Sequence, residues 1–144
     1  MRTGFKISGF GEMDRRLLAV DRAMDDNREV MAVLLAALEP VAEGARQIVP
    51  VRSGKLRREI ATSDRALDAP AERGIAAYVG PSVAAEYADE VEMGRPARVE
   101  PSGREHDATR PHPYMRPSWD AEVANMPASV ADGLGRLIKR AAEG

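Results

Sequence analysis

The chain has 144 residues, no cysteine, a net charge of −2 and only 4% aromatic residues. This length fits a single domain, residues 1–144, whose core must be built from aliphatic side chains. The lack of cysteine excludes disulfides and thiolate metal sites, and the small net charge argues against a general nucleic-acid coat. No apolar run is long enough to span a bilayer, and the N-terminus lacks the apolar stretch of a signal peptide, so we expect a cytoplasmic protein.

The first predicted elements are a short strand and a helix. Residues 5–8 alternate apolar and polar side chains, which predicts a half-buried strand. Apolar residues then recur at Met13, Leu17, Val20 and Met24. These spacings of four, three and four residues predict an amphipathic helix.

A second, longer helix is the clearest predicted element. Residues 25–27 offer side-chain oxygens that can cap its start. Pro40 lies within the pattern and predicts a kink or a brief break near Glu39, and Pro50 ends the helix. Its apolar stripe consists of Val30, Val33, Leu34, Ala37, Leu38, Val41, Ala45 and Ile48.

The middle of the chain predicts short elements. Ser53 can cap a turn that places Leu56 and Ile60 on one face. Residues 58–63 are expected to be extended, and residues 64–73 are polar and are expected to form a loop.

A second strand is predicted over residues 74–79, with residues 80–81, Gly-Pro, as its stop. Ser82 can cap a third helix, which Gly94 ends.

Four prolines interrupt residues 95–113, where Val99 is the only large aliphatic side chain. Such a segment cannot bury enough apolar surface to fold by itself, so we expect a long extended loop. A terminal amphipathic helix follows over residues 119–142, and Pro127 should kink or restart it. Together these elements predict an α+β fold: long kinked helices packed on a small antiparallel sheet, with a long Pro-rich loop.

A hydrolase would need a nucleophile, a base and an orienting acid, for which Ser53, His112 and Asp120 are the nearest candidates. Ser53 lacks the strand–turn–helix setting of a nucleophile elbow and is more simply a helix cap.

Histidines offer a weak metal-site candidate. His106 and His112, with Glu105 and Asp107, lie in the polar loop, but their spacing is not that of a strong metal site. Solvated loop histidines are the simpler interpretation.

Two charged clusters are candidate interaction surfaces. One is basic and consists of Arg52, Lys55, Arg57 and Arg58. The other is acidic and consists of Glu86, Asp89, Glu90 and Glu92. Both can be solvated faces. The basic cluster could instead contact phosphate backbone, or pair with the acidic cluster of another copy in a heterologous interface.

Large side chains gather around the last prolines, at Tyr114, Met115 and Trp119, next to Arg116. They can anchor the terminal helix to the core. Alternatively they can form a binding hot spot, since Trp, Tyr and Arg are enriched at such sites.

Three blocks of the chain resemble the tailed-phage neck and tail-completion family that is often called gene-product-ten-like. The first is ARQIVPVRSGKLRREI at residues 45–60, similar to a family pattern A…A-P-V-x-[ST]-G-x-L-[RK]-x-S-I. The second is VGP at residues 79–81 with YADEVEMG at residues 87–94, similar to V-G…Y-A-x-x-V-E-x-G. The third is PHPYMRPSW at residues 111–119, similar to P-x-P-F-[LM]-R-P-A. Their order and spacing agree over nearly the whole chain.

The resemblance implies a structural virion protein with no catalytic, metal or cofactor site. It implies a homo-oligomeric ring, a hexamer or dodecamer, at the phage head–tail junction around the DNA passage, with assembly in the host cytoplasm. The implied partners are the stopper or connector, the tail terminator or the tail-tube protein, with non-specific DNA contact in the lumen and no membrane. Gene-transfer particles carry similar proteins. A DNA-binding accessory protein that uses the Arg52–Arg58 cluster is the alternative function.

Overall fold

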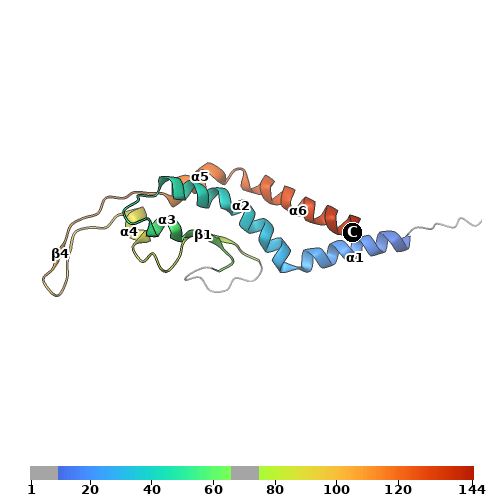
Figure 1. Ribbon diagram of the computed structural model, residues 1–144, viewed down its shortest axis with the longest axis horizontal. Helices are drawn as coiled ribbons and strands as arrows, with labels where there is room; N and C mark the ends of the chain where they lie inside the picture. Colours follow the sequence, from blue (N-terminus) through green and yellow to red (C-terminus); the bar gives the residue numbers. More distant parts are fainter. Residues whose placement is uncertain (1–9, 66–74) are drawn as a thin grey trace, which may run out of the picture.

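The computed structural model describes residues 10–65 and 75–144, and it confirms the predicted α+β class. Figure 1 shows an elongated molecule in which the helices α1 (Phe10–Asp25) and α2 (Asn27–Ile48) meet at a corner, and α6 (Met126–Glu143) lies along both. The remaining elements are α3 (Lys55–Glu59), β1 (Ile60–Ser63), β2 (Tyr78–Pro81), α4 (Ala88–Met93), β3 (Arg98–Val99), β4 (Glu105–His106) and α5 (Met115–Glu122). The predicted strand at residues 5–8 lies outside the described residues, as does most of the predicted loop 64–73.

The two N-terminal helices form as their apolar spacing predicts. Asp26 caps α2, because its Oδ1 accepts a hydrogen bond from the Arg28 amide at 3.0 Å. Pro40 lies exposed within α2, and the helix continues through it. Of the two predicted outcomes, the break does not occur and the kink stays a prediction. The apolar stripe buries one face of the helix at Ala37, Leu38, Val41, Ala42 and Ala45.

The sheet under α2 is the antiparallel pair β1–β2, in which Ile60 lies opposite Pro81 and Ser63 opposite Tyr78. The prediction of a strand at residues 74–79 that stops at Gly80 is wrong, since the strand begins at Tyr78 and includes Gly80 and Pro81. Pro81 is tolerated because it occupies the last position of a two-stranded ladder, where its missing donor is least costly.

The prediction that Ser82 starts a helix is also wrong, because α4 begins only at Ala88. The Ser82 amide donates to the Glu59 carbonyl at 3.0 Å, and the Ser82 hydroxyl donates to the Glu59 carboxylate. These contacts hold residues 82–87 as turns against α3, and they bury Ala85. A tertiary contact therefore overrides the local capping signal.

Residues 95–109 are not the structureless loop that was predicted. They form a hairpin, here called the arm, in which Arg98 pairs with His106 and Val99 with Glu105. An isolated bridge joins Arg95 to Thr109 at its base. The arm projects from the end of the molecule opposite α1 (Figure 1). Backbone hydrogen bonds order it, so it needs little apolar burial.

The C-terminal region contains two helices. α5 begins at Met115 and not at Trp119, as was predicted. α6 begins at Met126 with Pro127 in its first turn, which confirms the predicted restart at this proline.

The core lies where α2, α3, β1, α4 and the start of α5 meet. Tyr114, Ile60 and Val41 are its largest fully buried side chains. The buried cluster consists of Ala42, Ala45, Val49, Leu56, Ile60, Ala85, Ala88 and Tyr114. The two proline-containing segments, residues 49–60 and 111–119, therefore contribute side chains to one core.

Candidate interaction surface

The base of the arm is held by several independent contacts. The Arg95 guanidinium donates to both carboxylate oxygens of Glu90 at 2.9 Å, and Arg95 and Thr109 exchange backbone hydrogen bonds of 3.0 and 2.8 Å. Gly94 has φ 74°, and a Cβ there would lie 2.7 Å from the Thr109 carbonyl oxygen. The turn that starts the arm thus requires glycine, and the arm leaves the body in a defined direction.

Glu92 joins α4 to the start of α5. Its carboxylate accepts hydrogen bonds from the amides of Tyr114, Met115 and Arg116 at 2.7, 2.9 and 3.1 Å. Burial by itself would raise the pKa of Glu92, but these three backbone donors outweigh burial, and the pKa is lowered. The carboxylate supplies the cap that Tyr114, the residue preceding the helix, does not provide.

The predicted acidic cluster is therefore divided by the fold. Glu90 and Glu92 are engaged within the chain, whereas Glu86 and Asp89 are exposed. Glu92 accepts its hydrogen bond from Tyr114, which lies 22 positions later in the sequence, so no local sequence pattern reveals that Glu92 caps α5.

Tyr114 is buried, with 1% of its surface exposed, so it belongs to the core and cannot be an interface residue. Burial raises its pKa to about 12, with smaller contributions from Glu92 and Asp89. Its neighbours differ: Met115 is half-buried, Arg116 is exposed, and Trp119 is 42% exposed. The core-anchor interpretation holds for Tyr114, and an interface role stays a prediction for the other three.

Trp119 and Met115 line a shallow groove of about 720 Å³ between α5, α2 and β2. Leu38 and Val79 form much of its apolar wall. This groove is one candidate surface for a neighbouring protein.

The basic cluster begins at Arg52, in the proline-containing segment that joins α2 to α3, and continues on α3 with Lys55, Arg57 and Arg58. All four side chains are exposed. Arg57 donates to the Arg46 carbonyl oxygen at 2.8 Å. Within the described parts of the chain, Arg52, Lys55 and Arg58 form no ion pair. Three cationic groups are thus available at the surface.

A groove of about 570 Å³, here called the elbow groove, lies beside this cluster and reaches the base of the arm. Arg52 and Lys55 contribute its basic side, and Leu56, Tyr87 and Val91 contribute apolar surface from α3 and α4. The full lining also includes Pro50, Ser53, Gly54, Glu90 and Thr109.

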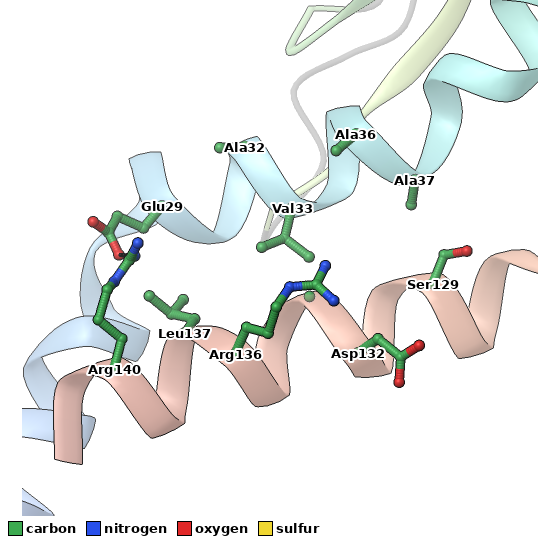
Figure 2. A pocket seen from close by; sticks show the side chains of 11 residues that line it. Glu29, Ala32, Val33, Ala36, Ala37, Ser129, Asp132, Arg136, Leu137 and Arg140 are labelled. Carbon is green, nitrogen blue, oxygen red and sulfur yellow. Dashed lines mark hydrogen bonds and ion pairs between the residues drawn. The ribbon is translucent and has the colours of Figure 1, made fainter. Parts of the chain in front are cut away.

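A third groove of about 650 Å³ runs between α2 and α6. Figure 2 shows Val33 and Ala37 of α2 pointing toward α6, and Arg140 reaching Glu29 across one end, where the two groups are 2.6 Å apart. A Cβ at Gly133 would overlap the Val33 side chain. The close approach of the two helices therefore explains the glycine at position 133, and no ligand is needed to account for it.

The structure does not assemble the weak chemical candidates. No hydrogen bond joins any two of Ser53, His112 and Asp120 among residues 10–65 and 75–144. His106 pairs with Glu100 at 2.9 Å, and no group of three metal-ligating side chains occurs in the described residues. No helix in that part of the chain is long and apolar enough to cross a membrane.

No protein-family model, curated protein or solved structure matches this chain.

Proposed function

We propose that this chain is a structural subunit of the head–tail junction of a tailed phage or of a phage-like gene transfer particle. Several copies form a ring around the DNA passage and join the connector or stopper to the tail terminator or tail tube. The three sequence blocks that resemble the neck and tail-completion family support the particle and the position.

One observation supports assembly in particular: the described residues expose more surface than a compact monomer would. The accessible surface of the chain is 11107 Å², whereas a compact protein of 15.6 kDa exposes about 7,300 Å². The difference is about 3,800 Å². The 18 residues outside the described ranges would expose only roughly 2,800 Å² even as a fully unfolded chain, so they do not account for all of it. A chain with this much uncovered surface is suited to packing against other subunits.

Several large apolar side chains are also exposed, and they are spread over the described part of the molecule. Leu17 and Met13 are exposed on α1, Val99 on the arm, and Trp119 on α5. They lie singly on separate elements, which is normal for monomeric proteins too, so the proposal rests on the sequence blocks and the surface area.

The test is to locate the chain in purified particles. Tailed particles from cells that carry the gene are analysed by mass spectrometry and by electron microscopy with an antibody against the chain. The proposal expects label at the junction of head and tail. Tailed particles that lack the polypeptide would contradict it.

A DNA-binding accessory protein is the second candidate, because Arg52, Lys55 and Arg58 are exposed and form no ion pair within the described residues. If these three groups contact phosphates, log K should fall with log salt with a slope of about −3. A slope near zero excludes this function.

A further inference from the structure

The arm has two chemically different faces. In an antiparallel hairpin, side chains alternate between faces, and cross-strand partners share one. Arg98 and His106 are partners, and both contact Glu100, at 4.0 Å and 2.9 Å. On this face the Glu100 carboxylate is thus already paired within the arm.

The opposite face carries Val99 and its cross-strand partner Glu105. Asp107 follows two residues after Glu105, just past the end of β4, and is exposed as well. Val99 is 67% exposed. Neither Glu105 nor Asp107 forms an ion pair with any residue of the described ranges. The face therefore presents one apolar side chain beside two carboxylates, and we call it the acidic face of the arm.

The elbow groove has the complementary pattern. Its apolar surface comes from Leu56, Tyr87 and Val91, and Arg52 and Lys55 stand at its side. A small apolar side chain flanked by carboxylates matches an apolar groove flanked by cations, because the hydrophobic contact and the charges then agree in position.

The arm of the same copy cannot fill this groove. Thr109, at the base of the arm, lines the groove itself, and the contacts of Glu90, Arg95 and Gly94 direct the arm away from it. Figure 1 shows the tip at the far end of the molecule. The occupant must come from another molecule.

We propose that the arm of one copy docks in the elbow groove of the next copy, with Val99 in the groove and Glu105 and Asp107 against Arg52 and Lys55. The tip and the groove are different patches, so the contact is heterologous and propagates from copy to copy until a ring closes. This inference rests on the proposed function, a ring of several copies, and identifies the contact that joins one copy to the next. It also replaces the acidic helix as the partner of the basic cluster, since two of the four helix carboxylates are engaged internally.

The experiment reverses charges on each side. One variant carries Glu105→Lys with Asp107→Lys, a second carries Arg52→Glu with Lys55→Glu, and a third combines all four changes. The oligomeric state of the purified full chain is measured by sedimentation velocity over a range of concentrations at low salt, after the melting temperature has shown that each variant folds.

We expect each two-site variant to raise the dissociation constant between copies at least tenfold. The four-site variant should bring that constant back towards the wild-type value. A matched control, Glu86→Lys with Asp89→Lys, makes the same charge change in the turn before α4 and in its first turn, and should leave assembly unchanged. Rings that form equally in all variants overturn the arm contact and leave the proposed function standing. A wild-type chain that stays monomeric at every concentration also overturns the arm contact, while the labelling of particles decides the proposed function separately.

Cross-linking gives a second readout, because the chain has no cysteine. Val99→Cys together with Tyr87→Cys should form disulfides between copies, seen as a ladder of oligomers on a non-reducing gel. Arg104→Cys with Tyr87→Cys, whose tip cysteine lies on the other face, should not. Equal ladders from both pairs contradict the proposed orientation.

If Arg52→Glu with Lys55→Glu abolishes DNA binding while the arm variant assembles normally, the basic cluster binds DNA and the arm contact is overturned.

Discussion

Glu92 allows a sharp test of how α4 is joined to the start of α5, because one carboxylate accepts hydrogen bonds from three consecutive amides of Tyr114, Met115 and Arg116. The substitution Glu92→Gln keeps the shape and removes the charge. Hydrogen bonds to a charged group contribute about 1.5–3 kcal/mol and neutral ones about 0.5–1.5 kcal/mol, while losing a helix cap costs about 0.5–2 kcal/mol. Since the site is half-buried and such contributions do not add, we expect a loss of about 2 kcal/mol.

Thermal unfolding followed by circular dichroism measures this loss. For a domain of this size about 1 kcal/mol corresponds to roughly 3–5 °C, so Glu92→Gln should lower the melting temperature by about 6–10 °C at pH 7. Glu86→Gln is the matched control, since Glu86 is exposed in the turn before α4, and it should change the free energy of unfolding by less than about 0.5 kcal/mol.

The same variant has a pH signature. The pKa of Glu92 lies below its ordinary value of 4.5, so its stabilising effect is fully present above pH 4.5 and is lost as the pH falls through the lowered pKa. The wild type and Glu92→Gln should therefore converge in acid. Equal melting temperatures for Glu92→Gln and Glu86→Gln at pH 7 would refute the capping role.

Two further predictions concern the packing of the body. In α6, Gly135→Ala should stabilise the protein by about 1 kcal/mol through helix propensity, because nothing lies within 4 Å of the added methyl group. Gly133→Ala should instead destabilise it relative to Gly135→Ala by about 1–3 kcal/mol, because the methyl group overlaps Val33, and equal effects in urea unfolding would contradict this packing. For Tyr114, whose pKa is raised to about 12, stability should be complete below pH 10 and fall as the pH rises towards 12. Tyr114→Phe should flatten that fall, and an ultraviolet titration in which all three tyrosines ionise together near pH 10 would disprove the burial effect.

The helices of the body were predictable from the sequence because their signals are local. Apolar spacing marks α1 and α2, Asp26 caps α2 as its side chain suggests, and Pro127 restarts the last helix. Helical hydrogen bonds join residues four apart, so the information lies within one or two turns.

The arm shows where local reasoning is insufficient. Its prolines and its lack of large aliphatic residues indicated a loop, yet Pro101 and Ser102 form a turn that the Gly103 amide closes on the Glu100 carbonyl, and the flanking residues pair as strands. The turn signal was present in the sequence. The anchor was not, because Arg95 and Thr109 are brought together only when Gly94 adopts its left-handed conformation.

By itself the sequence determined the helical body, the α+β class and the charged and apolar residues that could serve an interface. The tertiary structure alone decided which of them are available: it buried Tyr114, committed Glu90 and Glu92 to internal contacts, and left Glu105, Asp107, Arg52 and Lys55 at the surface. The physical reason is that the availability of a side chain depends on partners that are distant in the chain, and only folding brings those partners together.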